Sequence, residues 1–117
     1  MLIRTLIAAT LAVSSVAPSV AGDIPYRSKV ELKVGQSVIL KGVRARDCDA
    51  SRASSFSHIS GKLPNLKIGR LSNGGTGTVD SNSCGKTVPA RAIKFTATKK
   101  GTQRFTIYGD RFKVTVK

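Results

Sequence analysis

Tryptophan is absent from the sequence, and histidine and methionine occur once each, the methionine as the initiator. Cysteine occurs twice, which is too few for a four-ligand zinc site made of cysteines alone. A single histidine with no Gly-x-Ser-x-Gly motif offers little basis for a serine-hydrolase triad. Only six residues are acidic, and two of them, Asp47 and Asp49, lie beside arginines with which we expect them to form ion pairs. These shortages predict a protein that is not an enzyme and needs no cofactor.

Positive charge dominates what is present. The 117 residues include 20 lysines and arginines, and the formal net charge is +14. A chain of this length fits one small domain, and 40% hydrophobic residues indicate a globular chain and not a disordered one. We expect so strong a positive charge to attract anions to the protein.

The first 21 residues have the composition of a secretory signal peptide. Arg4 provides a short positive start, residues 5–13 are a short apolar run, and Ser19-Val20-Ala21 places small residues before a cleavage site after Ala21. Ala17 is a second possible site. A membrane anchor is the alternative, but the apolar run is far shorter than the ~20 residues that span a bilayer. We therefore expect residues 22–117 to be a single exported domain, periplasmic or secreted, without a transmembrane anchor.

Export favours a disulfide between the two cysteines, Cys48 and Cys84, because oxidising compartments pair an even number of thiols. The bond would close a loop of about 37 residues, for which chain entropy gives roughly 4 kcal/mol of stabilisation. The alternative is a metal site made of two reduced thiols and His58, the only histidine. That site would need further ligands from aspartates whose spacing is not diagnostic, so we expect no metal.

Alternating apolar and polar residues predict three consecutive antiparallel strands in the last third of the chain. Their apolar residues, which we expect to share one interior side, are Ile93, Phe95, Ala97, Phe105, Ile107, Phe112, Val114 and Val116. A two-residue turn at Gly109-Asp110 would pair Ile107 with Phe112. A three-residue connection at residues 100–102 would pair Phe95 with Ile107 in the preceding hairpin. Both registers place apolar residues opposite one another.

Shorter alternating runs begin near Val30 and Val38, and no later window has helical periodicity. Residues 49–61, rich in serine, and residues 72–83, rich in glycine, are predicted to be long loops that the disulfide draws toward one end of the domain. Short strands separated by turn residues, in about a hundred residues with one disulfide, are typical of a small antiparallel Greek-key, immunoglobulin-like β-sandwich. The expected fold class is therefore all-β.

The segment from Val88 to Tyr108 carries the pattern Phe-x-Ala-x-x-x-Gly at residues 95–101, followed by an alternating strand. This hairpin resembles the closing hairpin of bacterial immunoglobulin-like and cupredoxin-like domains, which implies a sandwich fold. Cupredoxins follow the strand with a copper-ligand loop containing Cys, His and usually Met, whereas here the loop is reduced to Gly109-Asp110, so copper binding of that type is excluded. Chagasin-like protease inhibitors are similar in the same hairpin, but their Asn-Pro-Thr-Thr-Gly and Arg-Pro-Trp loops are missing here. The resemblance leaves the activity open.

The three predicted strands together present a cationic outer face without an acidic residue. Its basic and aromatic members, our candidate anion-binding residues, are Lys94, Arg104, Tyr108, Arg111, Lys113 and Lys117. Adjacent like charges cost energy, so such a face either keeps an exported protein soluble or binds an anion. Candidate partners are lipopolysaccharide, an acidic glycan or an acidic protein. We do not expect sequence-specific nucleic-acid recognition, because one tyrosine is a poor stacking platform.

The leading hypothesis is an exported, monomeric, non-catalytic binding module that engages an anionic surface or an acidic partner through this face. An alternative is a secreted or periplasmic enzyme inhibitor whose two long loops form an insertion edge, with Phe56, His58 and Asn73 as contact residues. A third hypothesis is a structural envelope domain that assembles with other copies.

Overall fold

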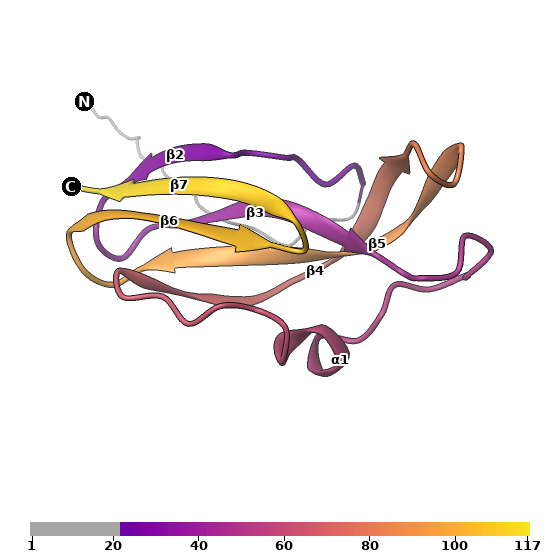
Figure 1. The fold of residues 1–117 in the computed structure, drawn as a ribbon, viewed down its shortest axis with the longest axis horizontal. Coiled ribbons are helices and arrows are strands. Elements are labelled where there is room, and N and C mark those ends of the chain that lie inside the picture. The colour runs from indigo at the N-terminus through magenta and orange to yellow at the C-terminus, as the bar shows by residue number, and fades with distance from the viewer. Residues whose placement is uncertain (1–21) are drawn as a thin grey trace, which may run out of the picture.

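Two three-stranded β-sheets, packed face to face, account for most of residues 22–117, the part of the chain that the computed structural model describes (Figure 1). The signal peptide expected at residues 1–21 lies outside the described residues. The long sheet has the strand order β3-β5-β4, with β3 at Ser37–Arg44, β5 at Lys86–Ala97 and β4 at Gly69–Ser81. The short sheet has the order β2-β7-β6, with β2 at Lys29–Leu32, β7 at Asp110–Val116 and β6 at Gly101–Ile107. A short helix, α1 at Phe56–Ser60, follows β3 in the chain.

The apolar residues expected on one interior side are buried in one core. The long sheet contributes Leu40, Val43, Ile93, Phe95 and Ala97, and the short sheet contributes Phe105, Ile107, Phe112, Val114 and Val116. The rings of Phe95, Phe105 and Phe112 stack in series between the sheets, with ring centroids 6.4 and 5.9 Å apart. Alternation therefore predicted correctly which side chains face the core, and a mostly-β fold is confirmed.

The predicted pairing of β5 with β6 is wrong, because the two strands belong to different sheets. β5 is the central strand of the long sheet, so both of its edges are already bonded, one to β3 and the other to β4. After Ala97 the chain crosses to the short sheet, and the Ile68 carbonyl accepts hydrogen bonds from the amides of Thr98 and Lys99 at the crossing. Gly101, with a φ of 145°, starts β6 in a conformation that favours glycine.

β6 and β7 form the predicted hairpin, but the register is two residues away from the predicted one. The turn consists of Tyr108 and Gly109 instead of Gly109-Asp110, and Phe105 lies opposite Phe112. Both turn residues have a positive φ, 46° and 84°, as in the type I′ turns that match the twist of a hairpin. A shift of two residues leaves the side chains within both strands on their predicted faces, because side chains alternate with a period of two, but it moves Tyr108 into the turn.

The glycine-rich residues 72–83 are not a loop, since most of them belong to β4. Small residues are required there because apolar side chains lie directly over the outer face of the long sheet. A Cβ at Gly74 would lie 2.7 Å from Cδ1 of Ile39, and a Cβ at Gly77 would lie 2.8 Å from Cγ1 of Ile24. Glycine runs are usually typical of loops, but here the glycines belong to a strand and allow Ile24 and Ile39 to approach its backbone closely.

The first described segment packs against the long sheet. The amide of Ile24 donates to the Thr78 carbonyl and the amide of Thr78 donates to the Gly22 carbonyl, both at 2.9 Å. Ile24 is buried in a second, smaller cluster with Ile39 and two alanines of β5. The long sheet is therefore covered on its outer side as well, by residues that precede β2.

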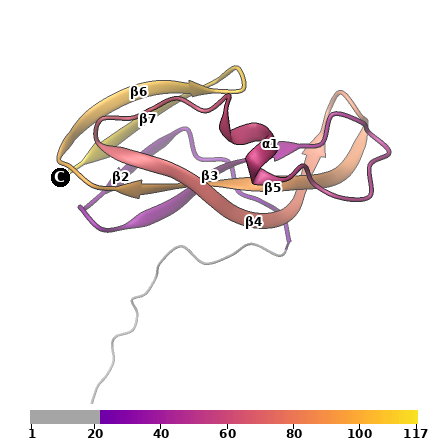
Figure 2. The same cartoon turned by 90° about the horizontal axis from the view of Figure 1, so that it is seen from below.

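Cys48 and Cys84 form the predicted disulfide, which joins the segment after β3 to the β4–β5 turn. Both thiols are oxidised, so the alternative of a metal site with His58 is wrong. Within the predicted loop at residues 49–61, α1 begins after Ser55, whose hydroxyl accepts a hydrogen bond from the His58 amide at 3.3 Å. Figure 2 shows α1 beside the β4–β5 hairpin, where its Ile59 reaches the core. A helix of one turn is too short to show periodicity in the sequence.

Candidate functional site

Three cations lie side by side across the outer face of the short sheet. Lys113 of β7 is directly opposite Arg104 of β6 on one side and Lys29 of β2 on the other. Lys113 points outward, because Phe112 and Val114 on either side of it face the core. Lys29 and Arg104 share its face, because residues directly opposite one another lie on the same side of a sheet. In the antiparallel pair, side chains that lie directly opposite one another have Cβ atoms about 4.5–5.5 Å apart. We call Lys29, Lys113 and Arg104 the cationic row.

The prediction that this face has no acidic residue is wrong, because β2 brings Glu31 onto it. The carboxylate of Glu31 is used elsewhere, however, since its Oε1 lies 3.0 Å from Nζ of Lys117. Both side chains are about two-thirds exposed, and such surface ion pairs contribute little to stability. Within the described residues, no member of the cationic row has a carboxylate within 4 Å.

Lys94 does not share this face. It lies in β5 opposite Ile39 and Ser72, on the outer side of the long sheet, because β5 and β6 are not paired. The predicted residues that do lie together on the short sheet are Arg104, Arg111 and Lys113. Lys117 follows β7 directly and pairs with Glu31 on this face. Lys29 was missed, since its neighbour β7 is far away in the sequence and the two strands are parallel.

The three residues expected on an inhibitory loop edge do not form one edge. Phe56 packs against the core, and Asn73 lies within β4, where its Oδ1 accepts hydrogen bonds from the Gly75 amide at 2.9 Å and from Arg91 at 3.2 Å. His58 is exposed on α1. The inhibitor hypothesis stays a prediction, but the two-loop geometry on which it depended is absent from the described residues.

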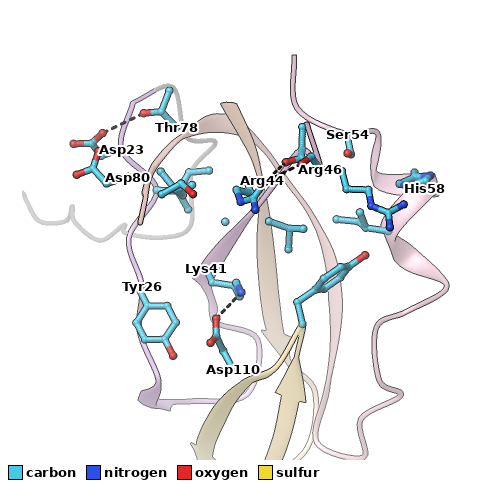
Figure 3. Close-up of a pocket in the computed structure, with 18 of the residues that line it drawn as sticks. Asp23, Tyr26, Lys41, Arg44, Arg46, Ser54, His58, Thr78, Asp80 and Asp110 are labelled. Carbon is cyan, nitrogen blue, oxygen red and sulfur yellow. Dashed lines mark hydrogen bonds and ion pairs between the residues drawn. The ribbon is translucent and has the colours of Figure 1, made fainter. Parts of the chain in front are cut away.

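A groove with a volume of about 820 Å³ borders β3 and the β6–β7 turn (Figure 3). Its volume is in the usual range for small-molecule sites. Tyr26 and Tyr108 both line it and are 56% and 42% exposed. The ring of Tyr26 packs against Phe112 with centroids 5.6 Å apart, so the aromatic series of the core continues into the groove. The sequence pattern predicts Tyr108 on the cationic outer face, but Tyr108 lies in the β6–β7 turn and lines this groove instead. Tyr26 has no role in the sequence prediction.

An ion pair joins the two sheets in this groove. Nζ of Lys41, on β3, lies 2.6 Å from Oδ2 of Asp110, the first residue of β7, and the Lys41 side chain is only 11% exposed. A β-bulge between Ile39 and Lys41 places Lys41 opposite the core residue Ile93, which turns it toward the space between the sheets. Figure 3 shows the pair next to Tyr26.

The remaining charges of the groove are separated by sign. The guanidinium group of Arg44 is held by the backbone of the next two residues, since its Nη1 donates to the carbonyls of Ala45 at 2.8 Å and Arg46 at 3.1 Å. Asp23 and Asp80 lie apart from these arginines in Figure 3. Their carboxylates accept hydrogen bonds from threonine hydroxyls, Thr78 at 3.1 Å and Thr87 at 2.7 Å. In the part of the chain that is described, Arg44 and Arg46 have no carboxylate within 4 Å.

Two features are absent from residues 22–117. These residues contain no helix with the length and apolar character needed to cross a bilayer. They also contain no group of three or more His, Cys, Asp or Glu side chains arranged to hold a metal ion.

Comparison of the chain with models of known protein families, with curated proteins and with solved structures finds no match. Function is therefore inferred from the geometry of the cationic row and the groove.

Proposed function

We propose that this protein is an exported, non-catalytic binding module that takes an anionic glycan, such as lipopolysaccharide or an acidic polysaccharide, on the outer face of the short sheet. The observation that carries the proposal is the cationic row, in which Lys29, Lys113 and Arg104 occupy directly opposed positions on three neighbouring strands. Arg111 extends the positive surface along β7.

The cationic row lowers the stability of the folded, unbound protein. Like charges directly opposite one another destabilise a sheet, whereas opposite charges stabilise it. Glu31 lies on the same face but pairs with Lys117 and leaves the row without a counter-charge. A polyanion laid across the strands would provide several negative groups at once and would relieve this repulsion.

We infer that the frame carrying this face is immunoglobulin-like. The order β3-β5-β4 corresponds to the B-E-D strands of that fold, and the β6–β7 hairpin corresponds to F and G. The segment with α1 would take the place of strand C. A disulfide agrees with export to an oxidising compartment, where the envelope glycans that we propose as ligands are found.

Two charge reversals distinguish a binding face from a general effect of charge. Lys113→Glu and Lys94→Glu change the net charge equally, but Lys113 lies in the cationic row and Lys94 on the outer face of the other sheet. We expect Lys113→Glu to weaken binding to heparin and to purified lipopolysaccharide about tenfold at physiological ionic strength, a loss of about 1.4 kcal/mol. Lys94→Glu should change affinity much less. Titrations at several salt concentrations measure both effects.

Equal losses in the two variants would contradict the proposal, because they would show that only net charge matters. Unchanged binding in Lys113→Glu would also contradict it and would leave the row as a solvated surface. If neither polyanion binds but an acidic protein is retained through Lys113, the ligand class is wrong. Circular dichroism of each variant checks that the fold is intact.

A further inference from the structure

We propose that the groove bordering β3 is a second binding site, specific for a saccharide unit that carries a carboxylate. We call it the tyrosine groove, after Tyr26 and Tyr108, which line it. This site is separate from the cationic row, whose three residues are not among those lining the groove.

Both tyrosines of the sequence lie in this groove and both are substantially exposed. An exposed aromatic ring forgoes the free energy that its burial would provide, so two of them in one groove call for a ligand. Sugar rings have an apolar C–H face that packs on aromatic rings and hydroxyl groups around the edge. The ring of Tyr26 is already positioned by its contact with Phe112, so little ordering is needed on binding.

The backbone of Tyr108 is a second argument for a ligand. Its φ of 46° places it in the left-handed region, where Asn, Asp and Gly are the favoured residues of a type I′ turn. A bulky residue in this conformation strains the backbone, because its Cβ approaches the neighbouring carbonyl oxygen. An asparagine would serve the turn better, so the tyrosine is explained by what its side chain does in the groove.

The polar groups define the part of the ligand that they would bind. In the ion pair of Lys41 and Asp110 the lysine is mostly buried and the carboxylate is partly exposed, and the pair offers a donor and an acceptor to sugar hydroxyls. Arg44 is held in place by two backbone carbonyls, and neither it nor Arg46 has a carboxylate partner among residues 22–117. A guanidinium group matches the geometry of a carboxylate, which is why we assign an acidic sugar rather than a neutral one.

The chain itself provides the reporter for a test. It has two tyrosines and no tryptophan, so its intrinsic fluorescence comes from the groove alone. We would titrate digalacturonate into the full folded domain and follow tyrosine emission, with galactobiose as the uncharged counterpart. The expected result is a saturable change with digalacturonate and at least tenfold weaker binding of galactobiose.

Two variants locate the site. Tyr108→Asn should bind digalacturonate about tenfold more weakly and should fold at least as stably as the parent, because asparagine suits the turn. Arg44→Gln should lose a similar factor for digalacturonate while leaving galactobiose binding unchanged. Lys113→Glu, in the cationic row, should bind digalacturonate like the parent.

Three results would overturn this inference. They are the absence of saturable binding, equal affinity for the charged and the neutral disaccharide, and unchanged affinity in Tyr108→Asn. A loss confined to Lys113→Glu would also overturn it, since the disaccharide would then be bound by the short sheet, and the function proposed for that face would stand. Conversely, digalacturonate can bind the groove as expected even if polyanions fail to bind the cationic row, so the two proposals are tested independently.

Discussion

At the scale of single residues, the packing of the first segment on the long sheet depends on the absence of a side chain at Gly77. A Cβ at Gly77 would meet the Gly22 carbonyl oxygen and would lie 2.8 Å from Cγ1 of Ile24. The neighbouring Thr78 forms two backbone hydrogen bonds with this first segment. One methyl group at residue 77 would therefore push against the backbone of Gly22 and the side chain of Ile24, and would displace the first segment from the sheet.

We expect Gly77→Ala to lower the free energy of unfolding by about 1–3 kcal/mol, the usual range for overpacking. Urea denaturation measures the loss, and faster hydrogen exchange at the Thr78 amide would locate it. Gly61→Ala is the matched control, because a Cβ there meets nothing within 4 Å and the φ of Gly61 is −67°. Equal midpoints for both variants would mean that the first segment does not hold the sheet.

At the scale of elements, the long β4–β5 hairpin depends on its tether. β4 has 13 residues and β5 has 12, and the short strands of the other sheet are too short to cover both along their full length (Figure 1). The disulfide between Cys48 and Cys84 fixes the turn of this hairpin to the segment after β3. An exposed ion pair from Lys86 to Asp49, at 3.0 Å, lies nearby.

Replacing both cysteines by serine should lower the free energy of unfolding by roughly 2–4 kcal/mol, because the bond closes a long loop in the unfolded chain. Thermal unfolding of the double variant, compared with the oxidised parent, gives the value. We expect Lys86→Ala to change stability by less than about 1 kcal/mol, since exposed ion pairs contribute little. A double variant as stable as the parent would show that the hairpin needs no covalent tether.

At the scale of the whole molecule, the charge balance opposes folding. The formal charge is +14, and the structure shows three ion pairs within residues 22–117. Repulsion among like charges destabilises a compact state, and salt screens it over a Debye length of about 10 Å at 0.1 M. The cationic row concentrates this repulsion on one face.

We therefore expect the melting temperature to rise by several degrees when sodium chloride is increased from about 10 to 150 mM. Lys113→Thr should reduce this gain more than Lys94→Thr, because only Lys113 has cations directly opposite it. Differential scanning calorimetry of the three proteins provides the comparison. A melting temperature that falls with salt would indicate that the three ion pairs outweigh the repulsion.

The candidate sites differ in how far the sequence could predict them. Arg104 and Lys113 were placed on one face correctly, since a hairpin makes them close neighbours in the sequence and in space. Lys29 and Glu31 reach the same face through a parallel pairing with β7, and no local pattern encodes a contact of that range. The tyrosine groove is assembled from the first segment, β3 and the β6–β7 turn, so it exists only in the folded chain.

The pattern of amino acids determined by itself which side chains turn inward, because alternation has a period of two and a two-residue slip in register preserves it. It also predicted the disulfide, since two cysteines have one possible pairing within the chain. Only the tertiary structure decided to which sheet each strand belongs. Both sheets face the same core, so Phe95 and Phe105 are equally inward whether their strands pair or pack across from one another. Because β3 and β4 are hydrogen-bonded to the two edges of β5, β6 cannot pair with it. Lys94 therefore lies on a different sheet from Lys113.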